Sequence, residues 1–169
     1  SYSRRFFWLA VFIVILFGGY SAGWYYVADR ILQATKVAIA EANRDGVTAE
    51  CANPAMHGYP FRIGVYCDSV AYDNSGEQVA FAAGNLRTAG QIYDPARIVA
   101  ELDGPARLDL PDEQQIELSW DALRASVRLA QPLPERLSIE GNAMAVVAGG
   151  RSLGKADAFE AHARPNGAD

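Results

Sequence analysis

The 23 residues from Phe6 to Ala28 contain no charged side chain, and this run limits the possible folds more than any other feature. About 20 helical residues cross the hydrocarbon core of a bilayer, which is roughly 30 Å thick. The run is therefore long enough to span a membrane, and aromatic residues flank it as they do at membrane interfaces. We predict a transmembrane helix over residues 6–28. The predicted membrane-interface residues are Arg4, Arg5, Trp8, Trp24, Tyr25 and Tyr26.

The basic residues in front of this run predict its orientation. Positive charge stays on the cytoplasmic side, so Arg4 and Arg5 place residues 1–5 in the cytoplasm and the rest of the chain outside. In a Gram-negative cell this predicts a single-pass inner-membrane protein with a periplasmic domain. A cleavable signal peptide is the rival interpretation, with Ser21-Ala22-Gly23 as its cleavage site. The apolar run continues past that site through Tyr26, which favours an uncleaved signal anchor.

The charge balance differs between the two parts of the chain. The formal net charge is -5, with 15 basic and 20 acidic residues. Residues 1–26 hold Arg4 and Arg5 and no acid, so the remainder has 13 bases against 20 acids, or -7. Nucleic-acid binding depends on neutralising phosphates with Lys and Arg, so we predict no nucleic-acid partner. The same balance argues against docking of the domain body on anionic lipid.

Two different periodicities follow the apolar run. Residues 29–46 show the stripe of an amphipathic helix, and Gly46 is a typical residue to end it. From Val47 onward, short alternating runs separated by turn residues predict an antiparallel meander of six or seven strands over residues 47–164. Residues 165–169 are expected to be a tail or a truncated continuation. The predicted fold class is α+β and β-rich: a transmembrane helix that continues into an amphipathic helix, then a groove-like sheet.

No catalytic constellation stands out in the sequence. The two histidines, His57 and His162, accompany no Gly-x-Ser-x-Gly elbow, and a nucleophile needs both a base and an orienting group. Structural zinc takes four clustered Cys or His ligands, which this chain lacks in suitable spacing. Nucleotide-binding glycine motifs are also missing. We therefore predict a protein that is not an enzyme and has no metal, cofactor or catalytic residue.

The two cysteines bracket the stretch CANPAMHGYPFRIGVYC. Outside the inner membrane, two cysteines with no other partners are expected to form one disulfide, here Cys51–Cys67. The 15-residue loop between them would constrain the unfolded chain by about 3 kcal/mol. We predict Cα atoms about 5.5 Å apart on neighbouring strands. Gly58, Tyr59 and Pro60 are predicted to form a structural turn, with Tyr59–Pro60 as a candidate cis bond.

The chain resembles a family catalogued as domain of unknown function 2125. The resemblance rests on the aromatic-flanked apolar run, the Gly58-Tyr59-Pro60-Phe61-Arg62 block between the cysteines, Gln91-Ile92-Tyr93-Asp94-Pro95, Gly104-Pro105-Ala106 and Trp120. It implies an inner-membrane-anchored envelope protein of alphaproteobacteria with no established activity. The layout is similar to AsmA-type envelope proteins, whose twisted sheets form apolar grooves for lipid. That second similarity is an analogy of fold, which does not fix function.

Two functions remain open from the sequence. A sheet with one apolar face must cover it, and a helix of about 17 residues covers only part of six or seven strands. The remainder needs more chain, a partner or an apolar ligand such as lipid. The alternative is an accessory or assembly subunit of an integral membrane protein complex. Small residues would allow close helix approach in that case. They are Gly18, Gly19, Ala22 and Gly23.

Overall fold

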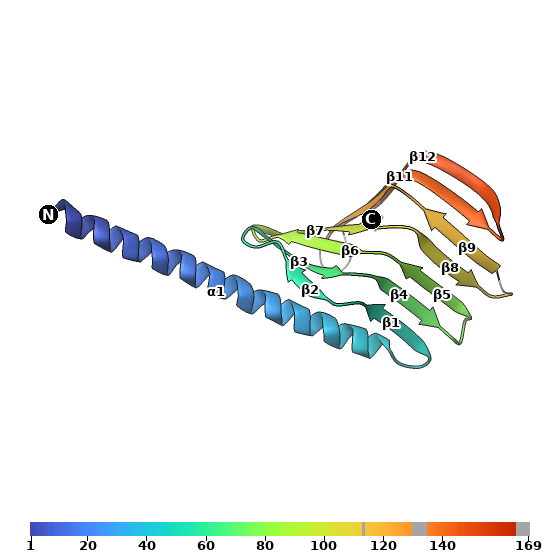
Figure 1. The fold of residues 1–169 in the computed structure, drawn as a ribbon, viewed down its shortest axis with the longest axis horizontal. Coiled ribbons are helices and arrows are strands. Elements are labelled where there is room, and N and C mark those ends of the chain that lie inside the picture. Colours follow the sequence, from blue (N-terminus) through green and yellow to red (C-terminus); the bar gives the residue numbers. More distant parts are fainter. Residues whose placement is uncertain (113, 130–134, 165–169) are drawn as a thin grey trace, which may run out of the picture.

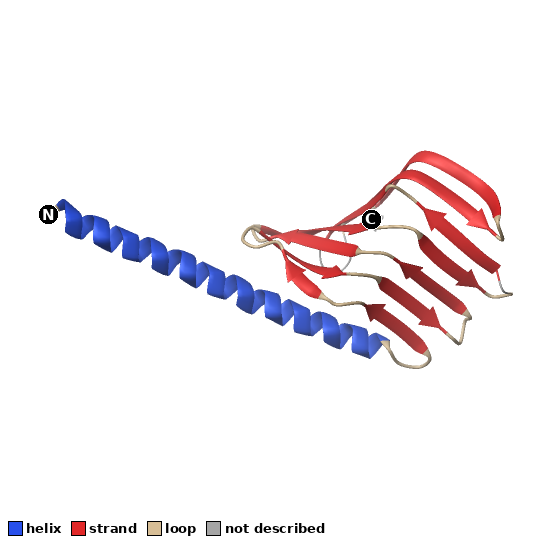
Figure 2. Ribbon diagram, in the orientation of Figure 1, coloured by secondary structure: helices blue, strands red, loops and turns tan. Residues whose placement is uncertain are grey.

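The computed structural model describes residues 1–112, 114–129 and 135–164. One long helix precedes twelve antiparallel strands that form a single curled sheet (Figures 1 and 2), which confirms the predicted fold class. The predicted tail at 165–169 lies outside the described residues. The elements are α1 (Tyr2–Ala42), β1 (Val47–Cys51), β2 (Ala55–His57), β3 (Arg62–Cys67), β4 (Val70–Asn74), β5 (Val79–Ala83), β6 (Leu86–Gln91), β7 (Asp94–Leu102), β8 (Ala106–Leu110), β9 (Gln114–Ser119), β10 (Ala122–Arg128), β11 (Arg136–Ala148) and β12 (Arg151–Ala163).

Helix α1 runs without a break through both predicted helical segments. Its N-terminal half projects beyond the sheet, and its C-terminal half runs beside β1 and β2 (Figure 1). It is long and apolar enough to cross a membrane. The helix ends at Ala42, four residues before the predicted end at Gly46. The Asn43 side chain accepts a hydrogen bond from the Ala49 backbone N–H, and Gly46, with φ of +82°, lies in the turn that leads into β1.

The twelve strands form seven rows that follow one another in chain order. β1 pairs with β4 while β2 pairs with β3, so β1 and β2 lie end to end beside β3 and β4. The same pattern joins β5 with β6, β7 with β8, and β9 with β10. The long strands β11 and β12 form rows 6 and 7. The six or seven strands predicted from sequence therefore correspond to rows, because interruptions divide five rows into two strands each.

The interruptions keep one face of the sheet apolar. Side chains alternate between faces along a strand. In row 5 the apolar positions are even-numbered before the interruption (Ile116, Leu118) and odd-numbered after it (Leu123, Ala125). One extra residue, as in a β-bulge, returns the apolar side chains to the same face. In-register neighbours on the apolar face include Ile98, Val127 and Leu137; on the polar face they include Arg97, Arg128 and Arg136.

The apolar face is only partly covered. Helix α1 packs against β1, β2 and β3, and the later rows have no covering element among the described residues. Ile98, Val127 and Leu137 are therefore half-exposed. This agrees with the expectation that one helix cannot cover the whole sheet. The buried apolar side chains of the described residues are Trp24, Ala28, Cys67, Ala83 and Ala106.

Candidate functional site: an apolar groove

The turn between β2 and β3 fastens the sheet to the helix. Tyr59 stacks on Tyr25, with ring centroids 5.7 Å apart, and meets Trp24 edge-on at 5.4 Å. The Tyr59 hydroxyl lies 2.5 Å from Ser21 Oγ, and the Tyr20 hydroxyl donates to the Pro60 carbonyl oxygen. Gly58 has a φ of +113°, which a glycine adopts readily, and the Tyr59–Pro60 peptide is cis. Of the three predicted turn residues, Tyr59 and Pro60 thus contact the helix, and Gly58 supplies the backbone conformation of the turn.

The predicted membrane-interface aromatics have different surroundings. Trp24 is 6% exposed, and its Nε1–H donates to the Arg62 carbonyl oxygen at 2.9 Å, so it packs on the sheet. Tyr25 is exposed at its outer side and stacked on Tyr59. Tyr26 is 67% exposed. At the other end of the span, Trp8 is exposed beside Phe7, and Arg4 and Arg5 are exposed before it.

The small residues of the helix fall into two groups. A side chain added at Gly18 or Gly19 would meet no atom within 4 Å, so neither glycine packs on the described part of the chain. Ala22 is exposed as well. Gly23 instead lines the space between helix and sheet. Close packing of Gly18, Gly19 and Ala22 against another helix stays a prediction.

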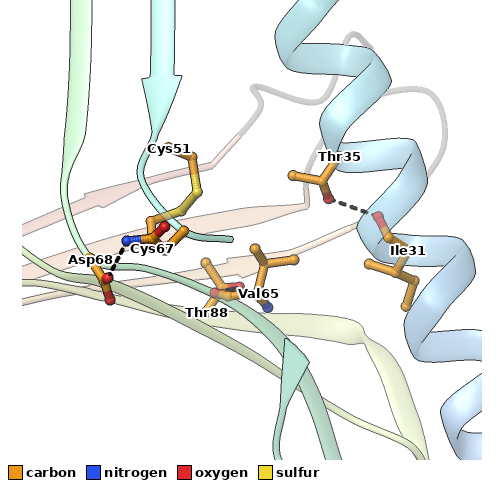
Figure 3. The surroundings of a disulfide bond; sticks show 8 residues. Ile31, Thr35, Cys51, Val65, Cys67, Asp68 and Thr88 are labelled. Atoms are coloured by element: carbon orange, nitrogen blue, oxygen red, sulfur yellow. Dashed lines mark hydrogen bonds between the residues drawn. A yellow bond between two sulfur atoms is a disulfide. The ribbon is translucent and has the colours of Figure 1, made fainter. Parts of the chain in front are cut away.

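The Cys51–Cys67 disulfide forms as predicted, although the two strands that carry it, β1 and β3, do not pair with each other. Cys51 ends β1 and Cys67 ends β3, so the bond joins rows 1 and 2 at their interruptions, with a Cα–Cα distance of 5.3 Å. Beside it, Asn53 Nδ2 donates to Asp68 Oδ2 at 2.9 Å, which also links the two interruptions. Figure 3 shows the disulfide on the sheet with Ile31 and Thr35 on the neighbouring helix.

An apolar groove of about 580 Å³ lies between the helix and the apolar face of the sheet. Its volume is within the range of pockets that hold small molecules, roughly 300–1,000 Å³. Side chains from the helix form one wall, and β3, β6 and β7 form the other. The groove is lined almost entirely by apolar surface, so it suits a hydrocarbon chain more than a polar ligand. Its lining residues include Tyr20, Gly23, Trp24, Val27, Ile31, Ile63, Val65, Thr88, Gly90 and Ile98.

The Thr88 hydroxyl in the groove wall already has hydrogen-bond partners in the protein. Thr88 Oγ1 accepts from the Val65 backbone N–H at 2.9 Å and donates to the Val65 carbonyl oxygen at 2.8 Å. The hydroxyl thus bridges both backbone groups of Val65, and β3 and β6 come close at Gly64. A Cβ on Gly64 would lie 1.7 Å from the Thr88 carbonyl oxygen, closer than any real contact. The groove wall is therefore apolar despite its threonine, and only glycine fits at position 64.

An ion-pair network on the polar face links rows 3, 4 and 5. Arg87 holds Asp103 in a two-pronged contact of 2.7 and 2.8 Å, and Glu101 accepts from Arg124 at 2.6 Å. The hydrogen bonds from Arg87 lower the pKa of the Asp103 carboxyl below its ordinary value. The carboxylate in turn raises the pKa of Arg87. No local sequence pattern predicts this network, because its members span 37 residues, from Arg87 to Arg124, and only the register brings them together.

The two histidines lie outside the groove. His57 stacks on Tyr66 with ring centroids 4.3 Å apart. His162 Nδ1 lies 2.9 Å from Ser138 Oγ, and its Nε2 lies 3.9 Å from Glu160. His162 and Glu160 side chains are 63% and 68% exposed, so water competes for these contacts and no desolvated environment activates the serine. Within the described ranges, no group of three His, Cys, Asp or Glu side chains is arranged to hold a metal ion.

Comparison with known proteins places the chain in a family. No curated protein and no solved structure matches it. One family model, described as "Uncharacterized protein conserved in bacteria (DUF2125)", matches residues 24–169. That range begins at Trp24, where the helix meets the sheet, and includes the disulfide and every strand. Since the match extends over most of the sequence, this protein belongs to the DUF2125 family.

Proposed function

We propose that this protein is a membrane-anchored periplasmic protein, not an enzyme, whose groove binds or shields the acyl chain of a lipid or a similar apolar molecule. The observation that carries the proposal is the apolar groove of about 580 Å³ between α1 and the sheet. Hydrophobic surface of this extent favours an apolar occupant over water. Because α1 forms one wall, the groove continues directly from the apolar segment that would cross the bilayer.

The proposed location rests on two features. Arg4 and Arg5 precede the apolar segment, which favours a cytoplasmic N-terminus in the inner membrane. The Cys51–Cys67 disulfide suits an oxidising compartment, as the periplasm is. Together they support a single-pass anchor with the sheet on the periplasmic side.

Photo-crosslinking tests the groove. The full chain is reconstituted in vesicles that contain a phospholipid with a diazirine in its acyl chain, and the crosslinked peptides are identified by mass spectrometry. We expect labels on β3 and on Ile98 in β7, in addition to the apolar half of the helix. Labels confined to residues 6–19 would show that lipid contacts only the span and would contradict the proposal.

Two groove-filling substitutions sharpen this test. Gly23→Leu and Gly90→Leu add bulk inside the groove without a clash at Cβ, since Gly23 has no atom within 4 Å and Gly90 has only ordinary contacts at 3.7 and 3.8 Å. Both should lower the labelling of β3 and β7 by a large factor. Gly18→Leu is the matched control, because Gly18 also has open space but does not line the groove. Equal labelling in all three variants would argue against an occupied groove.

The second proposed function, an accessory subunit of an inner-membrane complex, is favoured by the exposed Gly18, Gly19 and Ala22 on the helix. Such small residues allow close approach of a neighbouring helix. Gentle solubilisation followed by native mass spectrometry tests it. A stoichiometric partner that is lost in the Gly18→Leu variant supports this function, and a monomer at native abundance contradicts it.

A further inference from the structure

One end of the sheet carries exposed apolar side chains at the tips of its turns. This end, here called the proximal end, includes the β2–β3 turn, the β6–β7 turn and the end of β10. Phe61 is 70% exposed and Tyr93 is 76% exposed. The Ile92 N–H donates to the Phe61 carbonyl oxygen at 3.1 Å, and the Leu129 N–H donates to the Ala96 carbonyl oxygen at 2.8 Å, so these tips are neighbours. The exposed apolar side chains here are Tyr59, Phe61, Ile92, Tyr93 and Leu129.

The opposite end of the sheet, here called the distal end, includes the α1–β1, β4–β5, β8–β9 and β11–β12 turns and has no comparable group of exposed apolar side chains in its described turns. Its described turns hold small, polar and charged residues, among them Asp45, Ser75, Glu77 and Asp112. The remaining exposed large apolar residues of the sheet lie along strands and not at turns; they are Tyr72, Leu153 and Phe159. Among the described turns, exposed aromatic side chains therefore lie at the proximal end. Such a surface is suited to contact with an apolar or interfacial environment and not with bulk water.

The proximal end is also positively charged. Rows 2, 4, 5, 6 and 7 each place one arginine there. Acidic residues in the same described segments (58–62, 91–97, 128–129, 135–136 and 162–164) number two, Asp94 and Glu135, so the five arginines leave a net charge of +3. Glu135 pairs with Arg128 at 3.3 Å. The arginines are Arg62, Arg97, Arg128, Arg136 and Arg164.

Three of these arginines stand directly opposite one another. Arg97, Arg128 and Arg136 are in register across rows 4, 5 and 6, on the polar face. Like charges on adjacent strands destabilise a sheet, so the row is unfavourable for folding by itself. An anionic partner would relieve this repulsion. The chain as a whole is acidic but has a basic end, so its net negative charge does not prevent this surface from binding anionic lipid.

The position of the helix sets the level of the proximal end. Tyr25 lies 20 residues after Arg5, and 20 helical residues rise about 30 Å, the thickness of the hydrocarbon core. Tyr59 stacks on Tyr25, so the proximal end lies where the outer headgroups begin. Figure 1 shows this end of the sheet beside the middle of the helix. Aromatic tips would enter the interface, and the arginines behind them would meet phosphate groups.

We propose that the proximal end of the sheet docks on the periplasmic surface of the bilayer and binds its anionic phospholipids. This inference rests on the membrane anchoring in the proposed function, and not on occupancy of the groove. Docking would turn the groove wall at Tyr20 and Trp24 toward the leaflet, so an acyl chain could enter without crossing water.

Quenching by brominated lipid measures the depth of each end. A tryptophan is placed at the proximal tip by Tyr93→Trp and, as the control, at the distal turn by Glu77→Trp. Each full chain is reconstituted in phosphatidylglycerol vesicles with brominated acyl chains, and quenching is compared with that of the parent protein. We expect added quenching for the proximal tryptophan and none for the distal one. No added quenching at position 93, while Trp8 in the span is quenched, would overturn the docking and leave the anchor intact.

A charge series tests the headgroup contact. The triple variant Arg62→Gln, Arg97→Gln, Arg136→Gln should lower the ratio of docked to undocked protein by roughly fivefold per arginine, because each contributes about 1 kcal/mol near an anionic surface. The matched control removes three distal charges with Arg44→Gln, Arg107→Gln and Arg151→Gln and should leave quenching unchanged. Equal effects of the two triple variants, or equal quenching in neutral phosphatidylcholine, would contradict anionic recognition. Protection of the tips by a protein partner without bromolipid quenching would contradict the bilayer as partner.

Discussion

At the scale of single residues, small groups decide how closely backbone segments approach. Gly64 allows β3 to come so near β6 that the Thr88 hydroxyl replaces a regular pair of backbone hydrogen bonds. On the helix, the indole N–H of Trp24 donates a hydrogen bond to the Arg62 carbonyl oxygen and holds the helix against the sheet. Each of these contacts shapes the wall of the groove.

Gly64→Ala should destabilise the fold. Its Cβ would lie 1.7 Å from the Thr88 carbonyl oxygen, so backbone atoms would have to move, and overpacking of this kind typically costs about 1–3 kcal/mol. Urea unfolding of the reconstituted chain, followed by circular dichroism, measures the loss. Gly154→Ala in β12 is the control, because Gly154 has no atom within 4 Å and should tolerate the change. Equal midpoints for both variants would show that β3 and β6 are not closely spaced.

Asp103→Asn should weaken the fold in a pH-dependent way. The Arg87 hydrogen bonds hold the Asp103 pKa below its ordinary value of 3.8. A lowered pKa stabilises the fold above pH 3.8, and this contribution declines below that value and is lost as the pH falls through the lower pKa of the folded state. The pair is partly exposed, so the difference between parent and variant should be at most about 1 kcal/mol near pH 7. Unfolding midpoints measured from pH 7 down to pH 3 should converge; a difference that persists at acidic pH would assign the effect to another cause.

At the scale of elements, interruptions organise the sheet. In row 5 the interruption adds one residue, so the apolar side chains stay on one face of the sheet. The disulfide joins two of these interruptions, between β1 and β3. It therefore fixes rows 1 and 2 to each other at the place where regular pairing is broken.

Loss of the disulfide should destabilise the sheet by about 3 kcal/mol, as a cross-link that closes a 15-residue loop does in the chain-entropy model. Thermal unfolding with and without dithiothreitol measures this for the parent protein. The double variant Cys51→Ser, Cys67→Ser should resemble the reduced parent and show no response to reductant. A parent protein that unfolds identically in both conditions would show that the bond contributes nothing to stability.

At the scale of the whole molecule, the groove and the basic end lie together. The helix forms a wall of the groove, and the Tyr59 turn that clasps the helix also belongs to the proximal end. If lipid enters the groove from the bilayer, variants that abolish docking should also slow labelling of β3 and β7. In contrast, the groove-filling variants Gly23→Leu and Gly90→Leu should leave the bromolipid quenching of a tryptophan at position 93 unchanged.

The sequence by itself determined the kinds of secondary structure and the disulfide. An uncharged run of 23 residues can satisfy its backbone in an apolar environment only as a helix, and alternating apolar residues can form only strands with one apolar face. The Cys51–Cys67 bond was predictable because two cysteines offer a single pairing. Local composition was sufficient for these features.

Tertiary structure decided everything that depends on which rows are neighbours. The short strand β2, the bridge between Thr88 and Val65, and the contacts of Arg87 with Asp103 follow from register across the sheet, which no local pattern specifies. The groove depends on the angle between helix and sheet, and the basic end depends on which ends of the rows coincide. Alternation along a strand assigns each side chain to a face, but only the folding of the rows against one another brings distant residues to the same end.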